Sequence, residues 1–263
     1  MNEKGIEFYK KWFKIYVNQF YGINNYINKN IELKENHTFR VCANIVNISK
    51  SVKLNGKDLF IAELIALFHD IGRFEQFRDY NTFNDKNSED HAEMSVRILR
   101  RENILKELPP EIIEVIENVI QLHNKRDIFR SSDNSKIIYF SKLLRDSDKL
   151  DILKVLTEYY SSDQIEKNPA LDLDLPESDE LSNSVENDIL NNKTINVNKL
   201  NSSVDYKLFL ISWIFDINFN FTLKIIQKLK FIQKIFDSLP ENSKINKIRT
   251  HVEDYIKNKL KDN

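Results

Sequence analysis

Apolar residues recur along this chain mostly at three- and four-residue spacing, which is the period of an amphipathic helix. No stretch alternates between apolar and polar residues strongly enough to indicate a strand. Only four glycines and five prolines interrupt the pattern. The sequence therefore predicts an all-α protein. Its expected helices cover roughly residues 4–28, 34–53, 57–69, 88–102, 109–124, 134–160, 181–192, 203–219, 221–238 and 243–260.

The spacing of these helices also predicts how the chain is divided. Residues 161–180 are rich in Ser, Asp and Pro and are typical of a connection. They separate a predicted core, residues 1–160, from residues 161–263, whose aromatic and aliphatic faces need burial. We expect this second part to be a helical layer packed on the core rather than an independent domain. The same faces leave a homodimer as an open alternative.

Composition narrows the functional classes. Hydrophobic residues make up 41% and charged residues 30% of the 263, as in globular proteins, and the net charge is −1. No positive field is available to attract nucleic acid. The single cysteine, Cys42, excludes an internal disulfide and is expected to be a packed structural thiol. The charged N-terminus lacks a signal peptide, and the most apolar windows, 59–68 and 208–215, are too short to cross a bilayer. These features predict a cytoplasmic protein with no membrane segment.

Four of the five histidines, together with two aspartates, occupy helix positions from which they can meet in one place. A fifth, His251, is expected to be an ordinary helix residue. Imidazole and carboxylate together suit a first-row transition metal better than calcium or magnesium. One residue opens a predicted helix, an adjacent pair closes the next, and the others lie in a first turn, in a last turn and inside a long helix. The candidate ligands, in that order, are His37, His69, Asp70, His91, His123 and Asp148.

The order of these residues resembles the HD-domain metal-dependent phosphohydrolases, an all-helical superfamily. LFHDIGRFEQF looks like the HDIG form of its His-Asp doublet, and RDSDKLD looks like its late aspartate motif. The histidines of DHAEMSV and QLHNK resemble those of members that hold two metals. The resemblance covers about residues 34–160. The chain lacks the Gly-Tyr-Pro signature of the cyclic dinucleotide enzymes, and Arg73 stands where many members have lysine.

The resemblance implies two divalent ions. His37, His69, Asp70 and Asp148 would hold one ion, and Asp70 would bridge to a second ion held by His91 and His123. Iron, manganese, nickel, cobalt and zinc all tolerate such ligands. The ions would provide hydroxide near neutral pH and neutralise phosphate oxygens.

Further residues are expected around the ions. Arg73 would clamp a phosphate oxygen, and Lys125 and Lys149 are additional candidates for phosphate contacts. Asp146 is a candidate hydrogen-bond acceptor for a ligating imidazole, or a general acid for the leaving group. Residues 73–90 are polar with interleaved aromatic rings and are the best candidate for a substrate lid. In that segment Tyr80 is a candidate substrate contact.

The expected function is that of a phosphomonoesterase or phosphodiesterase acting on a nucleotide or another small phosphorylated metabolite. Two alternatives stay open. Some HD-fold proteins, such as myo-inositol oxygenase, use a di-iron centre to activate oxygen. A non-catalytic helical module would instead bind a nucleotide and pass the signal to a partner through residues 181–263.

Overall fold

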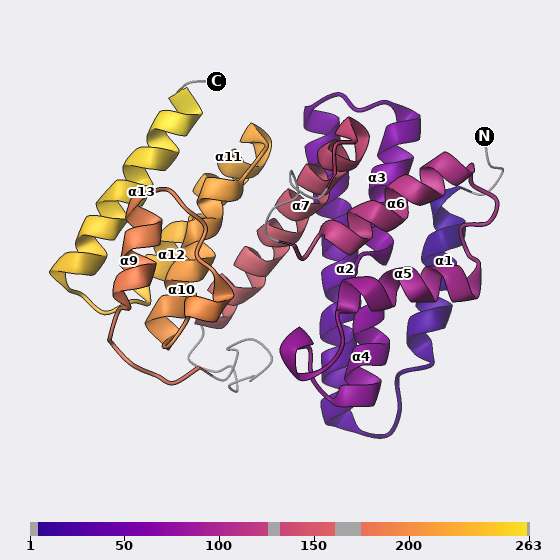
Figure 1. The fold of residues 1–263 in the computed structure, drawn as a ribbon, viewed down its shortest axis with the longest axis horizontal. Coiled ribbons are helices and arrows are strands. Elements are labelled where there is room, and N and C mark those ends of the chain that lie inside the picture. The colour runs from indigo at the N-terminus through magenta and orange to yellow at the C-terminus, as the bar shows by residue number, and fades with distance from the viewer. Residues whose placement is uncertain (1–4, 126–131, 161–174, 262–263) are drawn as a thin grey trace. The chain divides into compact units, whose positions relative to one another are not determined.

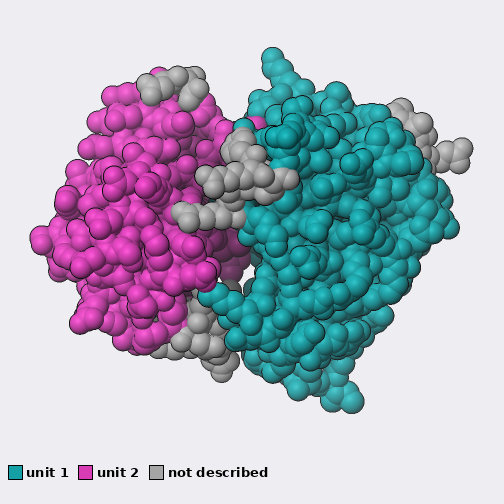
Figure 2. Space-filling model, viewed as in Figure 1, with its two compact units in different colours: residues 1–151 teal, residues 152–263 magenta. Residues whose placement is uncertain are grey.

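The computed structural model describes residues 5–125, 132–160 and 175–261. Helices dominate these residues and none of them forms a strand, so the predicted all-α class is confirmed. The chain divides into two compact units, residues 1–151 and 152–263 (Figure 2). The boundary lies inside helix α7 (Ser135–Tyr160), whereas the sequence predicted a division after residue 160. The packing of a C-terminal layer on the core stays a prediction, and the predicted connection 161–180 lies largely outside the described residues.

The first unit is a bundle of helices around α3, with α7 completing it (Figure 1). Its other helices are α1 (Ile6–Asn18), α2 (Asn25–Ser51), α3 (Gly56–Phe68), α4 (Gly72–Tyr80), α5 (His91–Glu102) and α6 (Pro110–Leu122). Helix α3 packs against α1, α2 and α6, and α5 packs against α4 and α6.

Helix α3 is apolar on almost every side because neighbours surround it. Consecutive residues from Leu64 to Phe68 are fully buried. A helix that is hydrophobic all round belongs in a core. Asn55 caps its start, where the side chain accepts a hydrogen bond from the backbone of Asp58. Whatever follows Phe68 therefore emerges in the middle of the bundle, which is where the His-Asp pair comes.

The predicted helix over 4–28 is wrong, because the chain breaks there and restarts. Helix α1 ends at Asn18, and the side chain of Asn24 accepts hydrogen bonds from the backbone of Tyr26 and Ile27 to begin α2. Helix α2 thus starts well before the predicted 34. His37 consequently lies in the middle of a long helix instead of opening one.

Helix α4 was not predicted from the sequence, because most of its residues are polar. Phe74 and Phe77 provide its buried apolar side at a spacing of three residues, and Asn81 ends it in the left-handed conformation. Gly72 itself is not a left-handed helix end, because no glycine among the described residues has a positive φ. It begins α4, at a point where a Cβ would lie only 2.3 Å from the carbonyl oxygen of His91. Its role is to let α4 and α5 approach each other.

The second unit contains shorter helices that pack on one another. They are α9 (Asn183–Leu190), α10 (Ser203–Ser212), α11 (Asn220–Lys228), α12 (Phe231–Asp237) and α13 (Ser243–Lys261). The predicted helix over 221–238 is two helices, since Lys230 adopts the left-handed conformation between them. The predicted helix over 203–219 becomes 3-10 at Trp213–Asp216. In the described part of the chain, every helix is too short or too polar to span a bilayer.

Candidate metal centre

The six candidate ligands come together in the first unit from five helices. His37 lies in α2 and Asp148 in α7, while His69 follows α3 directly and Asp70 comes next to it. His91 is the first residue of α5, and His123 directly follows α6. Placing most of the ligands at helix ends lets several helices point at one spot without crossing it.

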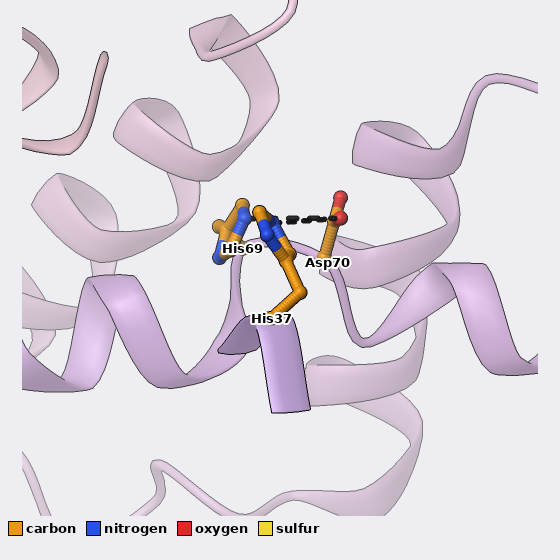
Figure 3. Close-up of side chains that lie close together, drawn as sticks. All are labelled: His37, His69 and Asp70. Atoms are coloured by element: carbon orange, nitrogen blue, oxygen red, sulfur yellow. Dashed lines mark ion pairs between the residues drawn. The ribbon is translucent and has the colours of Figure 1, made fainter. Parts of the chain in front are cut away.

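One side of the centre is formed by His37, His69, Asp70 and Asp148. The Nε2 atom of His37 lies 3.1 Å from Asp148 Oδ1 and 3.6 Å from Asp70 Oδ2. The Nε2 atom of His69 lies 3.8 Å from Asp70 Oδ2 and 3.9 Å from Asp148 Oδ1. Figure 3 shows the rings of His37 and His69 turned toward the carboxylate of Asp70. Two nitrogens and two oxygens therefore face a common point.

The other side is formed by Asp70, His91 and His123. Here it is Asp70 Oδ1 that faces the rings, at 3.4 Å from His91 Nε2 and 3.7 Å from His123 Nε2. The ligand atoms of this group lie within 4.8 Å of one another, as do those of His37, His69 and Asp70. The two carboxylate oxygens of Asp70 thus point to different pairs of imidazoles, which is the arrangement that a bridging ligand requires.

All four imidazoles are held through their Nδ1 atoms. His69 and His123 donate from Nδ1 to the backbone carbonyls of Ala66 and Ile120, at 2.8 and 2.6 Å. His37 and His91 use carboxylates instead.

These two carboxylates are Asp151, 2.7 Å from His37 Nδ1, and Asp85, 2.7 Å from His91 Nδ1. The sequence suggested Asp146 as such an acceptor; Asp146 is fully buried, but the four Nδ1 atoms have these other partners. Hydrogen bonds of this kind fix the tautomer of a metal-binding histidine and aim its Nε2 lone pair.

The buried nitrogens at the centre fit a bound cation. The Nε2 atoms of His37 and His69 are buried and make no hydrogen bond. The Nε2 atoms of His91 and His123 lie only 3.0 Å apart, and because both rings carry a proton at Nδ1, two lone pairs face each other there in the neutral state. Such an arrangement is costly unless a cation accepts the lone pairs. The donor set of imidazoles and carboxylates is the one that divalent transition metals prefer.

The ionisation of these groups agrees with ligation. Burial lowers the pKa of His69 to about 4 and that of His91 to about 4, so both rings are neutral at pH 7. Burial also opposes the charge on Asp70, but Lys34, His69 and Arg73 hold the pKa of this carboxyl well below its usual range. At His37, burial lowers the pKa, but the neighbouring carboxylates of Asp148 and Asp151 outweigh it, so the net shift is upward. A metal bound there would displace a proton from His37.

Two cations contact the carboxylate of Asp70. Arg73, expected from the sequence, places Nε 3.5 Å from Asp70 Oδ1. Its Nη1 atom lies 2.9 Å from Gln76 Oε1, 2.5 Å from the Phe83 carbonyl and 3.0 Å from Asp85 Oδ1. The second cation, Lys34, was missed; its Nζ atom donates to Asp70 Oδ2 at 2.8 Å. A signal existed in the sequence, since Lys34 precedes His37 by one turn of the same helix.

The other predicted substrate contacts differ in their burial and partners. Lys125 forms an ion pair with Asp90 at 2.6 Å, and Asp90 also caps α5 at His91. This pair therefore ties the end of α6 to the start of α5. Lys149 is buried in α7. Tyr80, at the end of α4, is 47% exposed and forms no hydrogen bond with a candidate ligand among the described residues.

Comparison with known proteins identifies the segment that carries this centre. A family model, the HD domain, matches residues 35–153. These residues run from just before His37 to just after Asp151 and contain all six candidate ligands. No curated protein and no solved structure matches the chain. Residues 35–153 of this chain belong to the HD-domain family, most of whose members are metal-dependent hydrolases.

Proposed function

We propose that the first unit is a phosphohydrolase with two divalent metal ions, acting on a nucleotide or another small phosphoester. The observation that carries the proposal is the division of the Asp70 carboxylate, with Oδ2 toward His37 and His69 and Oδ1 toward His91 and His123. Each half offers two imidazole nitrogens and one carboxylate oxygen, and Asp148 adds a fourth ligand to the first half. The remaining positions are left for water and substrate.

When bound, two divalent ions lower the pKa of a water and neutralise phosphate oxygens. The residues of the chain would position and orient the ligands for this chemistry. Asp70 sets the separation of the two sites, and the partners at Nδ1 keep the four rings oriented. Asp151 is held in turn by Arg40, whose Nε and Nη2 atoms donate to it at 2.6 and 3.0 Å. This rigid support reduces the reorganisation required during reaction.

Access to the centre favours a small substrate. The side chain of Asp148 is 22% exposed, whereas the other five candidate ligands are 7% exposed or less. A phosphoester would therefore reach the centre on the side of Asp148. The proposed substrate is a small phosphoester, and the family suggests nucleotides as its class.

Metal content and phosphate release test the proposal together. The wild-type chain, His69→Ala and His251→Ala would be purified without oxygen, reconstituted with each candidate metal and assayed on nucleotides and aryl phosphoesters. His251 is the matched control because it is a histidine of the second unit, bonds to Asn192 of the same unit and is not a candidate ligand.

We expect about two ions in the wild type and in H251A, and at least a hundredfold slower phosphate release in H69A, since an ion that stabilises the transition state is lost. Undiminished release by H69A would contradict the proposal. Oxygen uptake by the iron form, with no phosphate release from any ester, would favour the oxygenase alternative.

A further inference from the structure

Lys34 lies beside the candidate metal ligands without being one of them. Its side chain comes from α2, one turn before His37, and its Nζ atom lies 2.8 Å from Asp70 Oδ2. We propose that Lys34 is a substrate-binding residue that donates to a phosphate oxygen of the substrate. This inference rests on the proposed function, and it moves the phosphate contact from Arg73 to a residue that the HDIG motif does not include.

The hydrogen bonds of the two cations favour Lys34 for this role. The Nη1 atom of Arg73 is surrounded by acceptors from Gln76, Phe83 and Asp85. A lysine ammonium has three donors, and in the described part of the chain Asp70 Oδ2 is the one acceptor within reach of that of Lys34. The Nη1 atom of Arg73 is therefore committed to protein acceptors, whereas two of the three ammonium donors of Lys34 meet no acceptor among the described residues.

The charges around the centre lead to the same residue. Two other cations near the candidate ligands also pair with carboxylates outside the ligand set: Arg40 with Asp151, and Arg73 with Asp85. Among the described residues, Lys34 has only Asp70 as its ion-pair partner, and Asp70 is itself a candidate ligand. A metal ion that shares this carboxylate would leave the ammonium close to positive charge. An anionic group of the substrate, placed between them, offsets that repulsion.

The side chain of Lys34 is also partly accessible to solvent. Its side chain is 18% exposed, close to the 22% of Asp148. The face of the Phe83 ring lies 5.4 Å from its Nζ atom, and a cation over an aromatic face is stabilised there. Phe83 therefore helps to hold the ammonium beside Asp70.

Binding of inorganic phosphate to the metal-loaded full chain tests the proposal without requiring turnover. Calorimetric titrations would compare the wild type with Lys34→Met, Lys34→Arg and Lys50→Met, with metal content measured in each preparation. Lys50 is the matched control, because it is an exposed lysine at the far end of the same helix. Far-UV circular dichroism would check the fold, and Lys34→Gln would replace K34M if the latter fails to fold.

We expect K34M to keep both ions and to bind phosphate roughly tenfold to a hundredfold more weakly, as for loss of one charge-assisted hydrogen bond. K34R should recover most of the affinity, and K50M should match the wild type. Equal phosphate affinity in K34M and K50M would overturn the proposal, as would loss of metal from K34M, because Lys34 would then act only through Asp70. Hydrolysis of phosphoesters by the wild type is measured separately. If phosphate binding depends on Lys34 but no phosphoester is hydrolysed, the proposed hydrolase function is wrong and the assignment of Lys34 to phosphate binding still holds.

Discussion

The close approach at Gly72 allows a sharp test of how the centre is assembled. A Cβ at this position would lie 2.3 Å from the carbonyl oxygen of His91, 2.8 Å from the backbone nitrogen of Ser95 and 2.9 Å from Met94 Cβ. Two of these three atoms belong to the backbone of α5, so a change of rotamer cannot relieve the contact. Gly72→Ala must therefore push the start of α4 away from the start of α5.

The expected cost of Gly72→Ala follows from two opposing effects. Overpacking in a core costs about 1–3 kcal/mol. Alanine gains about 0.5–1 kcal/mol over glycine inside a helix, and the backbone of Gly72 has no positive φ that would oppose it. The backbone nitrogen of Gly72 also donates to Ser95 Oγ at 2.9 Å, a contact that the shift would stretch. The net result should be destabilisation by about 1–2 kcal/mol.

Thermal unfolding with metal analysis measures both consequences. Gly56 is the matched control, because it also begins a helix and its Cβ would meet nothing within 4 Å. We expect Gly72→Ala to lower the melting temperature by roughly 2–8 °C and to weaken the ion at His91, whereas Gly56→Ala should be neutral or slightly stabilising. If G72A and G56A have the same melting temperature and hold the same amount of metal, the contact with the His91 carbonyl does not limit the approach of α4 and α5.

Three further predictions concern groups described above. In the metal-free folded protein, the pKa values of His69 and His91 are about 4, below the ordinary 6.5. Between pH 6.5 and pH 4 the unfolded chain therefore binds more protons at these two residues than the folded protein does. Stability should therefore fall as pH falls from about 6.5 to 4, by at most roughly 1.4 kcal/mol per pH unit for each ring, and urea titrations at pH 7 and pH 5 that coincide would refute this. Asp85→Asn and Asp151→Asn should each weaken one ion by about 10–100-fold in chelator competition, and equal metal retention by both variants and wild type would argue against their role. Burial raises the pKa of Cys42 to about 12, so its thiol should react with Ellman's reagent only on unfolding; rapid reaction of the native protein would contradict its packing.

The residues that gather at the candidate centre could be selected from the sequence because histidine is scarce and each of them has a recognisable place on a helix. Helices α3, α5 and α6 carry clear apolar periodicity, and α6 begins at Pro110, within a residue of the predicted start at 109. These features are local, so a single sequence reveals them. The place of His37 was harder, because the start of α2 depends on the side chain of Asn24 rather than on periodicity.

The supporting residues were not predicted, because they depend on contacts between distant parts of the chain. Asp151 meets His37 across 114 residues, and Lys34 meets Asp70 across 36. Asp151 did leave a trace, since it follows Asp148 by three residues and so shares its side of α7. Asp85 left none, because its position depends on the path of an irregular segment after α4. Helix periodicity does not specify such a path.

The span between His37 and Asp148 gives the metal a structural consequence. These residues lie about 110 positions apart, in α2 and α7, and an ion held by both would close a loop that covers most of the first unit. A covalent cross-link around a loop of about 100 residues contributes about 4.7 kcal/mol in a chain-entropy model. The chain has one cysteine and cannot make such a link by itself. Bound metal would therefore serve as its removable cross-link, so that chelation would loosen residues 1–151.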